Sequence, residues 1–188
     1  MISDAELIGW SLLGDRDGFT EVVRRHEAVV GAYLARRAGH AAAEDLLAEV
    51  WLAAFRSRSS YDRSFPSARA WLIGIAHNIL RRHWRSLPRE DPLSETDPGV
   101  GWDPWPSIDE RVDTDRAVAG ALRNLRLGER EVLTLVVWED LSVADAARAL
   151  GIPPGTAYRY LHQARQALRS APGVLELLTE ADTVKHRK

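Results

Sequence analysis

Apolar residues recur every three or four positions along most of this chain, with charged and polar residues between them. This is the period of an amphipathic α-helix, and it predicts an all-α protein. Turn-forming residues separate the helical stretches, at Gly39 and His40 and through the loop at 57–67. The pattern predicts six helices ahead of the last motif of the chain: Ala5–Leu13, Asp17–Arg37, Ala43–Arg56, Ala68–Trp84, Asp115–Leu125 and Glu129–Trp138.

The segment Leu141–Arg169 predicts two short helices joined by a tight turn, a helix-turn-helix unit. Ser142 suits the N-cap of the first helix, and Gly151 can take the left-handed conformation that ends it. Two prolines then prevent continuation, and Thr156 is the expected cap of the second helix. The predicted buried stripe of the second helix consists of Ala157, Leu161, Ala164 and Leu168.

The other side of this second helix carries polar, aromatic and cationic residues: Tyr158, Arg159, His162, Gln163, Arg165 and Gln166. Such a helix can lie in the major groove of DNA, where the residues near its start reach the base edges. An ordinary helical hairpin within a bundle is the alternative interpretation of the same pattern.

Charge is unevenly distributed, although the net charge is only −2. Residues 1–85 hold 12 basic and 10 acidic side chains, residues 86–113 hold 2 and 8, and residues 114–171 hold 8 and 6. The acidic, proline-rich segment has no helical or strand period, which is typical of a linker. Its Trp102 and Trp105 are expected to dock on the chain's own domains or on a partner. We therefore predict two small helical domains at 1–85 and 114–171, joined by a flexible acidic linker at 86–113 and followed by a tail at 172–188.

Several functional classes find no support in the sequence. There is no cysteine, which excludes a disulfide framework and a thiolate metal site. No apolar run approaches the roughly 20 residues that span a membrane, and the N-terminus lacks a signal pattern. No paired acid and base, nucleophile elbow, phosphate loop or metal-ligand spacing is present. We expect a cytoplasmic binding protein without a metal or cofactor, and not an enzyme.

Three blocks, in this order and with this linker between the second and third, carry a family resemblance. They are AEDLLAEVWLAAF at Ala43–Phe55, AWLIGIAHNILRRHWR at Ala70–Arg85, and the block Leu127–Arg169 that contains the helix-turn-helix. Together they resemble a bacterial RNA polymerase sigma factor of the extracytoplasmic-function class (group 4) of the sigma-70 family. The resemblance covers roughly Gly14–Arg85 and Ala117–Arg169.

The resemblance implies that the first domain binds core polymerase and also recognises and melts the −10 promoter element. Melting requires a pocket for an unstacked base and cations for the displaced strand. Trp51 and Leu46 have an alternative place in the core, and Tyr61 and Phe65 have an alternative inward packing. The core-binding candidates are Asp45, Leu46, Glu49 and Trp51. The −10 candidates are Tyr61, Asp62, Phe65, Asn78, Arg81, Arg82, His83 and Arg85.

The same resemblance implies that the helix-turn-helix reads the −35 element. The residues carried over to this role are Thr156, Tyr158, Arg159, His162, Gln163 and Arg165. The sequence departs from the family pattern at positions 158 and 163, which are often arginine in the family. Since each missing cation removes a phosphate or guanine contact and lowers the salt dependence of binding, we expect this domain either to bind DNA weakly alone or to read an atypical element.

The implied partners are core RNA polymerase, through its β′ and β subunits, promoter DNA and an anti-sigma protein, without membrane insertion. Specificity would come from two weak modules whose affinities combine on one polymerase. The alternative function is a helix-turn-helix transcriptional regulator that acts without polymerase and uses its N-terminal helices to dimerise or to sense a signal. The block Ala43–Phe55 and the Trp- and Arg-rich helix after it favour the sigma factor, because a repressor does not require them.

Overall fold

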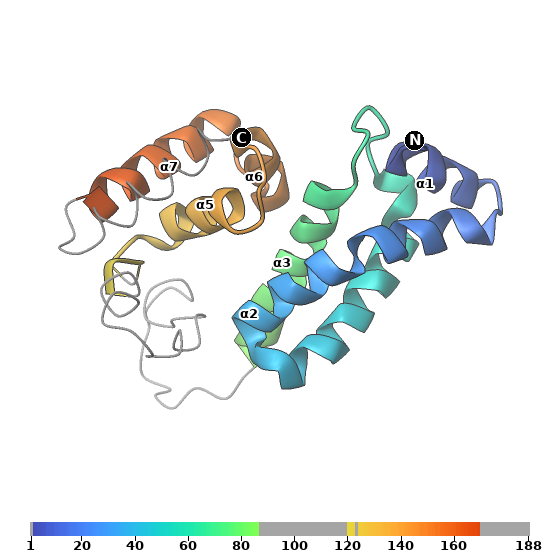
Figure 1. The fold of residues 1–188 in the computed structure, drawn as a ribbon, viewed down its shortest axis with the longest axis horizontal. Coiled ribbons are helices and arrows are strands. Elements are labelled where there is room, and N and C mark those ends of the chain that lie inside the picture. Colours follow the sequence, from blue (N-terminus) through green and yellow to red (C-terminus); the bar gives the residue numbers. More distant parts are fainter. Residues whose placement is uncertain (1, 87–119, 123, 170–188) are drawn as a thin grey trace, which may run out of the picture.

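The computed structural model describes residues 2–86, 120–122 and 124–169, and this part of the chain contains helices and no strand (Figure 1). The expected linker from residue 87 onward, the tail and most of the expected helix Asp115–Leu125 lie outside the described residues. The elements in chain order are α1 (Asp4–Leu12), α2 (Arg16–Ser57), the short 3₁₀ helix η1 (Arg58–Ser60), α3 (Arg69–Ser86), α5 (Leu127–Val137), α6 (Val143–Leu150) and α7 (Pro154–Arg169).

The long helix α2 is two helical arms joined at a sharp kink. Gly39 has φ 78° and ψ 162° there, while the residues on either side are helical. This region of backbone conformation is essentially restricted to glycine. Figure 1 shows the chain reversing at this point, so that the second arm runs back beside the first. The predicted break between the helices Asp17–Arg37 and Ala43–Arg56 is confirmed.

The N-terminal unit, α1 with α2 and α3, has its own apolar core. Ile8 from α1, Val22 and Val50 from the two arms of α2, and Leu72 and Leu80 from α3 are all fully buried in it. Burying such a side chain contributes about 1.5–3 kcal/mol, so these contacts dominate the stability of the unit. The core explains why the amphipathic faces of helices far apart in the sequence come together.

A buried carboxylate ties the start of α1 to the start of α3. Asp4 accepts hydrogen bonds from the amide of Ala68 at 2.9 Å and lies 2.7 Å from Nε2 of His26. Burial by itself would raise the pKa of Asp4, but the hydrogen bonds from His26, Ala68 and Arg25 lower it below its usual value of 3.8. Asp4 is therefore charged at neutral pH, and its buried carboxylate has hydrogen-bond partners.

The C-terminal unit, α5 with α6 and α7, is the predicted helix-turn-helix with one supporting helix. Ser142 caps α6 by accepting from the Asp145 amide at 3.0 Å, and Gly151 ends α6 with φ 65°. One expectation was wrong: Thr156 does not cap the second helix, because α7 already begins at Pro154. Proline suits the first helical position, where its missing N–H would have no partner. The predicted stripe of Ala157, Leu161, Ala164 and Leu168 is buried.

The two units pack directly against each other. Leu135, Leu141, Ala146 and Ala149 of the C-terminal unit belong to the same apolar cluster as the N-terminal core. In Figure 1, α6 is the helix of the C-terminal unit that lies beside α3. A Cβ added to Gly74 of α3 would come within 2.9 Å of the carbonyl oxygen of Ala149, so the two helices touch through their backbones.

Candidate functional site

The outer face of α7 is open to solvent and gathers the predicted DNA-reading residues. Tyr158 is 59 % exposed, and Arg159, His162 and Arg165 are also exposed, while Thr156 and Gln163 are half-buried. The inner face of the helix is held by the buried stripe and by Tyr160, whose ring lies against Gly128 of α5. The supporting helix therefore orients α7 so that one side carries aromatic, amide, imidazole and guanidinium groups outward.

The predicted polymerase-binding residues lie on the second arm of α2, but they do not share one surface. Asp45 and Glu49 are exposed, Trp51 is half-buried, and Leu46 is buried in the core with 4 % of its surface accessible. Leu46 therefore anchors the arm, which is the alternative that the pattern had left open, and it offers no docking surface in this arrangement.

Exposed apolar residues on the same arm were missed by the sequence analysis. Leu52 is 50 % exposed and Phe55 is 45 % exposed. The ring of Phe55 packs edge-on against Phe19 at 5.3 Å, and the guanidinium of Arg58 covers it at 3.8 Å. Helical spacing relative to Asp45 and Glu49 could have identified Leu52, since positions three and four apart share a face.

The loop between η1 and α3 turns its aromatic residues inward. Tyr61 is buried, its hydroxyl donates to the carbonyl of Phe65 at 2.6 Å, and its ring packs on Trp71 at 5.1 Å. Burial raises the pKa of Tyr61 to about 12. Phe65 is half-buried, because the guanidinium of Arg148 from α6 sits 3.4 Å from the centre of its ring. Tyr61 and Phe65 thus do not form an open base pocket in this arrangement, and their inward packing prevails.

Asp62 remains exposed at the tip of this loop. Its carboxylate accepts from the amide of Ser64 at 3.0 Å. The pKa of Asp62 is lowered mainly by hydrogen bonds from Ser64 and further by the positive charge of Arg148. The loop is therefore under the electrostatic influence of the C-terminal unit as well as in contact with it.

The C-terminal half of α3 presents the predicted cationic face. Asn78, Arg81, Arg82 and Arg85 are exposed, while His83 is half-buried. Arg82 donates to the carboxylate of Glu49, which joins this face to the second arm of α2. The expected DNA-binding and polymerase-binding residues are thus neighbours, although some 33 positions separate these two in the sequence.

A buried charged cluster joins the two units and was not predicted. Arg37 of α2, whose side chain is fully buried, lies 3.5 Å from Glu139 and 3.9 Å from Glu131 and donates to Thr134 at 3.1 Å. Arg36 binds the same Glu139 carboxylate at 2.6 Å. Nothing in the local pattern marks these residues, since arginine and glutamate on a helix are exposed by default.

Aromatic and imidazole groups of the N-terminal unit complete this cluster. The guanidinium of Arg37 stacks on the ring of Tyr33 at 3.9 Å, and the Tyr33 hydroxyl lies 3.3 Å from Nδ1 of His77. Burial lowers the pKa of His77 below 6.5, so its ring is neutral at neutral pH. Glu131 lies 3.7 Å from that same nitrogen, and its Oε2 accepts no hydrogen bond from the residues that the structure describes.

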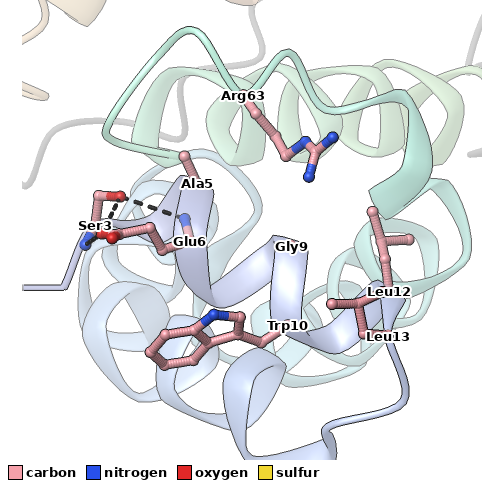
Figure 2. Close-up of a pocket in the computed structure, with 8 residues that line it drawn as sticks. All are labelled: Ser3, Ala5, Glu6, Gly9, Trp10, Leu12, Leu13 and Arg63. Carbon is pink, nitrogen blue, oxygen red and sulfur yellow. Dashed lines mark hydrogen bonds between the residues drawn. The ribbon is translucent and has the colours of Figure 1, made fainter.

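A hollow beside α1 is a further feature of the N-terminal unit (Figure 2). It is bordered by Gly9, Trp10, Leu12 and Leu13 of the α1 region and by Arg63 of the loop. Trp10 and Leu13 are exposed there, Leu13 at 88 %. Within the described residues no group of three potential metal ligands occurs, and no helix is long and apolar enough to cross a membrane.

Family comparison finds one match toward each end of the chain. The model of sigma-70 region 2 matches residues 22–90, and the model of sigma-70 region 4 matches residues 115–168. The RNA polymerase sigma factor CarQ of Myxococcus xanthus is 33 % identical over 170 residues, which are 87 % of this chain and 94 % of the relative. The extracytoplasmic-function RNA polymerase sigma factor SigM of Mycobacterium tuberculosis is 31 % identical over 177 residues, 92 % of this chain and 86 % of the relative.

Solved structures share the fold. CnrH in complex with the cytosolic domain of CnrY superposes with a TM-score of 0.62 at 24 % identity, covering 95 % of this chain and 98 % of the other. The sigma factor RpoE in complex with the anti-sigma factor NepR from Bartonella quintana gives a TM-score of 0.54 at 21 % identity, covering 86 % of this chain and 96 % of the other.

Proposed function

Since the chain belongs to the extracytoplasmic-function class of the sigma-70 family and directs RNA polymerase to promoters, we propose a division of labour among its helices. The second arm of α2 docks on core polymerase. The loop at 61–67 and α3 recognise and melt the −10 element, and α7 binds the −35 element. Sigma factors are non-catalytic initiation factors, and we propose that this chain likewise catalyses no reaction. We also propose that it acts with polymerase in the cytoplasm.

The outer face of α7 is the single observation that carries the assignment of DNA reading. Its inner side is held by a complete buried stripe, and Tyr158, Arg159 and His162 are exposed on the opposite side. Side chains at the start of a recognition helix are those that reach base edges. Of the six residues predicted to read the −35 element, only Arg159 and Arg165 are arginines. Because few of these side chains can bind phosphate as cations, we propose that the helix contacts mainly bases.

For polymerase docking we propose Asp45 and Glu49 together with Leu52 in place of the buried Leu46. Asp45, Glu49 and Leu52 follow one another at helical spacing and are all exposed. A surface that combines an exposed aliphatic side chain with two carboxylates suits a helical partner with apolar and basic residues. The polymerase β′ clamp is the expected partner for this surface.

We also propose an anti-sigma protein as a partner. The support is that a protein of the same fold, RpoE of Bartonella quintana, has been crystallised with an anti-sigma factor. The exposed Trp10, Leu12 and Leu13 beside the hollow of Figure 2 are apolar surface of the kind that partner proteins cover.

The test is reconstituted transcription. The purified chain is added to core RNA polymerase on a library of genomic promoter fragments, and transcript start sites are mapped. We expect start sites that depend on the chain, and we expect substitution of Leu52 by Glu to abolish them. Sequence-specific DNA binding by the chain alone, with no initiation on adding core polymerase, would instead favour the polymerase-independent regulator.

A further inference from the structure

One ion pair joins the surface that we assign to polymerase to the surface that we assign to the −10 element. Arg82 of α3 donates to the carboxylate of Glu49 on the second arm of α2. Of the exposed arginines on this face of α3, Arg82 is the one that pairs with a carboxylate among the described residues. Each of the two sites therefore has one of its charges bound to a charge of the other site.

Both side chains of this ion pair are open to solvent. The side chain of Arg82 is 65 % exposed and that of Glu49 is 51 % exposed. An ion pair in water is weak, and a partner of the right charge can reach either group. The two helices are held together by buried apolar residues such as Val50 and Leu80, so loss of the ion pair should leave the fold intact.

Each member of the pair reduces the attraction of the other for an outside partner. The negative charge of Glu49 repels a phosphate that approaches Arg82, and the positive charge of Arg82 repels a cation that approaches Glu49. A partner cation bound at Glu49 cancels the first repulsion, and a phosphate bound at Arg82 cancels the second. Binding at either site therefore strengthens binding at the other, and by the same factor.

We propose that Glu49 and Arg82 form a charge switch that couples polymerase docking to binding of the −10 strand. In the free chain the two groups neutralise each other. When a basic side chain of polymerase binds Glu49, the charge of Arg82 becomes available to the phosphate backbone of the DNA. The inference rests on the proposed assignment of Glu49 to polymerase and of Arg82 to the −10 element. Because the pair is exposed, the expected coupling is about two- to fivefold.

The charge switch predicts that loss of an arginine assigned to DNA strengthens binding to polymerase. Arg82→Gln leaves the full charge of Glu49 to a polymerase cation, so this variant should bind core RNA polymerase about two- to fivefold more tightly than the wild type. Glu49→Gln should bind core polymerase less tightly than the wild type. In the Glu49→Gln background the Arg82→Gln change should add nothing, because the carboxylate that Arg82 neutralises is already gone.

The matched control is Arg16→Gln, which also removes one positive charge. Arg16 is exposed at the start of α2 and is assigned to neither site, so its loss should leave the affinity for core polymerase unchanged in both backgrounds. Affinity is measured on the full chain by fluorescence anisotropy. Since the sequence has no cysteine, a single cysteine added at the C-terminus carries the dye. Circular dichroism should show unchanged helix content in every variant.

The salt dependence of promoter binding by the polymerase complex tests the DNA side of the switch. The probe is a promoter fragment whose start site has been mapped by reconstituted transcription. Arg82→Gln should reduce the log–log slope of affinity against salt by about 0.7, which corresponds to one phosphate contact on a single strand. Glu49→Gln, at a concentration that saturates core polymerase, should keep the wild-type slope, since Arg82 is available to the phosphate in both complexes.

Three results would each overturn the charge switch. Arg82→Gln could bind core polymerase no more tightly than the wild type. It could tighten binding equally in the Glu49→Gln background, which would show a general effect of charge. It could leave the salt slope unchanged, which would show that Arg82 does not bind the DNA backbone. Initiation by the wild type together with any of these results refutes the coupling alone, whereas absence of initiation by the wild type refutes the proposed function.

Discussion

The kink at Gly39 gives a sharp prediction, because it separates the two arms of α2 and lets the second arm pack beside the first. We consider Gly39→Ala. Among the described residues, no atom beyond the adjoining backbone lies within 4 Å of the added Cβ, so steric contact with other parts of the chain contributes nothing. The cost comes only from the backbone, which has φ 78° and ψ 162° at this residue.

The magnitude follows from the conformation. A residue other than glycine held in this region costs about 1–3 kcal/mol, and we take about 2 kcal/mol for alanine. Gly31→Ala is the matched control in the same helix, where the backbone is helical and the added Cβ makes an ordinary contact at 3.7 Å. In a helix interior the same change is favourable by about 1 kcal/mol. The two variants should therefore differ in the free energy of unfolding by about 3 kcal/mol, with opposite signs relative to the wild type.

Urea unfolding of the full chain, followed by far-ultraviolet circular dichroism, measures this difference. With a urea m-value of about 2 kcal/mol/M, the two midpoints should lie about 1.5 M apart. Coinciding midpoints, or a higher midpoint for Gly39→Ala, would refute the reasoning that the torsion at Gly39 imposes the kink.

Three further predictions follow from other parts of the structure. Asp4→Ala should lower the free energy of unfolding by about 3 kcal/mol in urea titrations, since it removes the acceptor of two buried hydrogen bonds. The pKa of Asp4 in the folded chain lies below the unfolded value of 3.8, so the charged carboxylate stabilises the fold above that value. The wild type should lose this stabilisation as the pH falls from 3.8 through the folded pKa. An equal loss of stability in Asp4→Ala over the same pH range would contradict the role of Asp4. Leu52→Glu should weaken binding to core polymerase by about tenfold or more in a pull-down titration without loss of helix content, and unchanged binding would remove Leu52 from the interface. Tyr158→Arg should steepen the salt dependence of promoter binding by the polymerase complex by about 0.9 in log–log slope, and an unchanged slope would mean that position 158 does not reach a phosphate.

Local signals in the sequence predicted most helices correctly. Ser3 and Ser142 accept hydrogen bonds at helix starts, and Gly39 and Gly151 end or break helices with positive φ, as their residue types indicate. The start of α7 was misjudged at Thr156. Proline and threonine both favour helix starts, and the helix begins at Pro154, where the missing N–H has no cost.

The candidate site was predicted in part. The outward face of α7 was correct because the buried stripe opposite it follows one period. Leu46 and Tyr61 were harder, since an apolar residue on an amphipathic helix or in a loop can face either the core or a partner. The structure shows that Leu46 and Tyr61 are buried, while Leu52 is exposed.

The sequence by itself determined the helices, the helix-turn-helix and the family, because these depend on periodicity, caps and short motifs. The tertiary structure alone decided that the two units close on each other and bury Arg37 with Glu131 and Glu139. The physical reason is that these partners lie about a hundred positions apart and sit on surfaces that charge and polarity would place in water. Whether such a residue is solvated or locked in an interface depends on what packs against it.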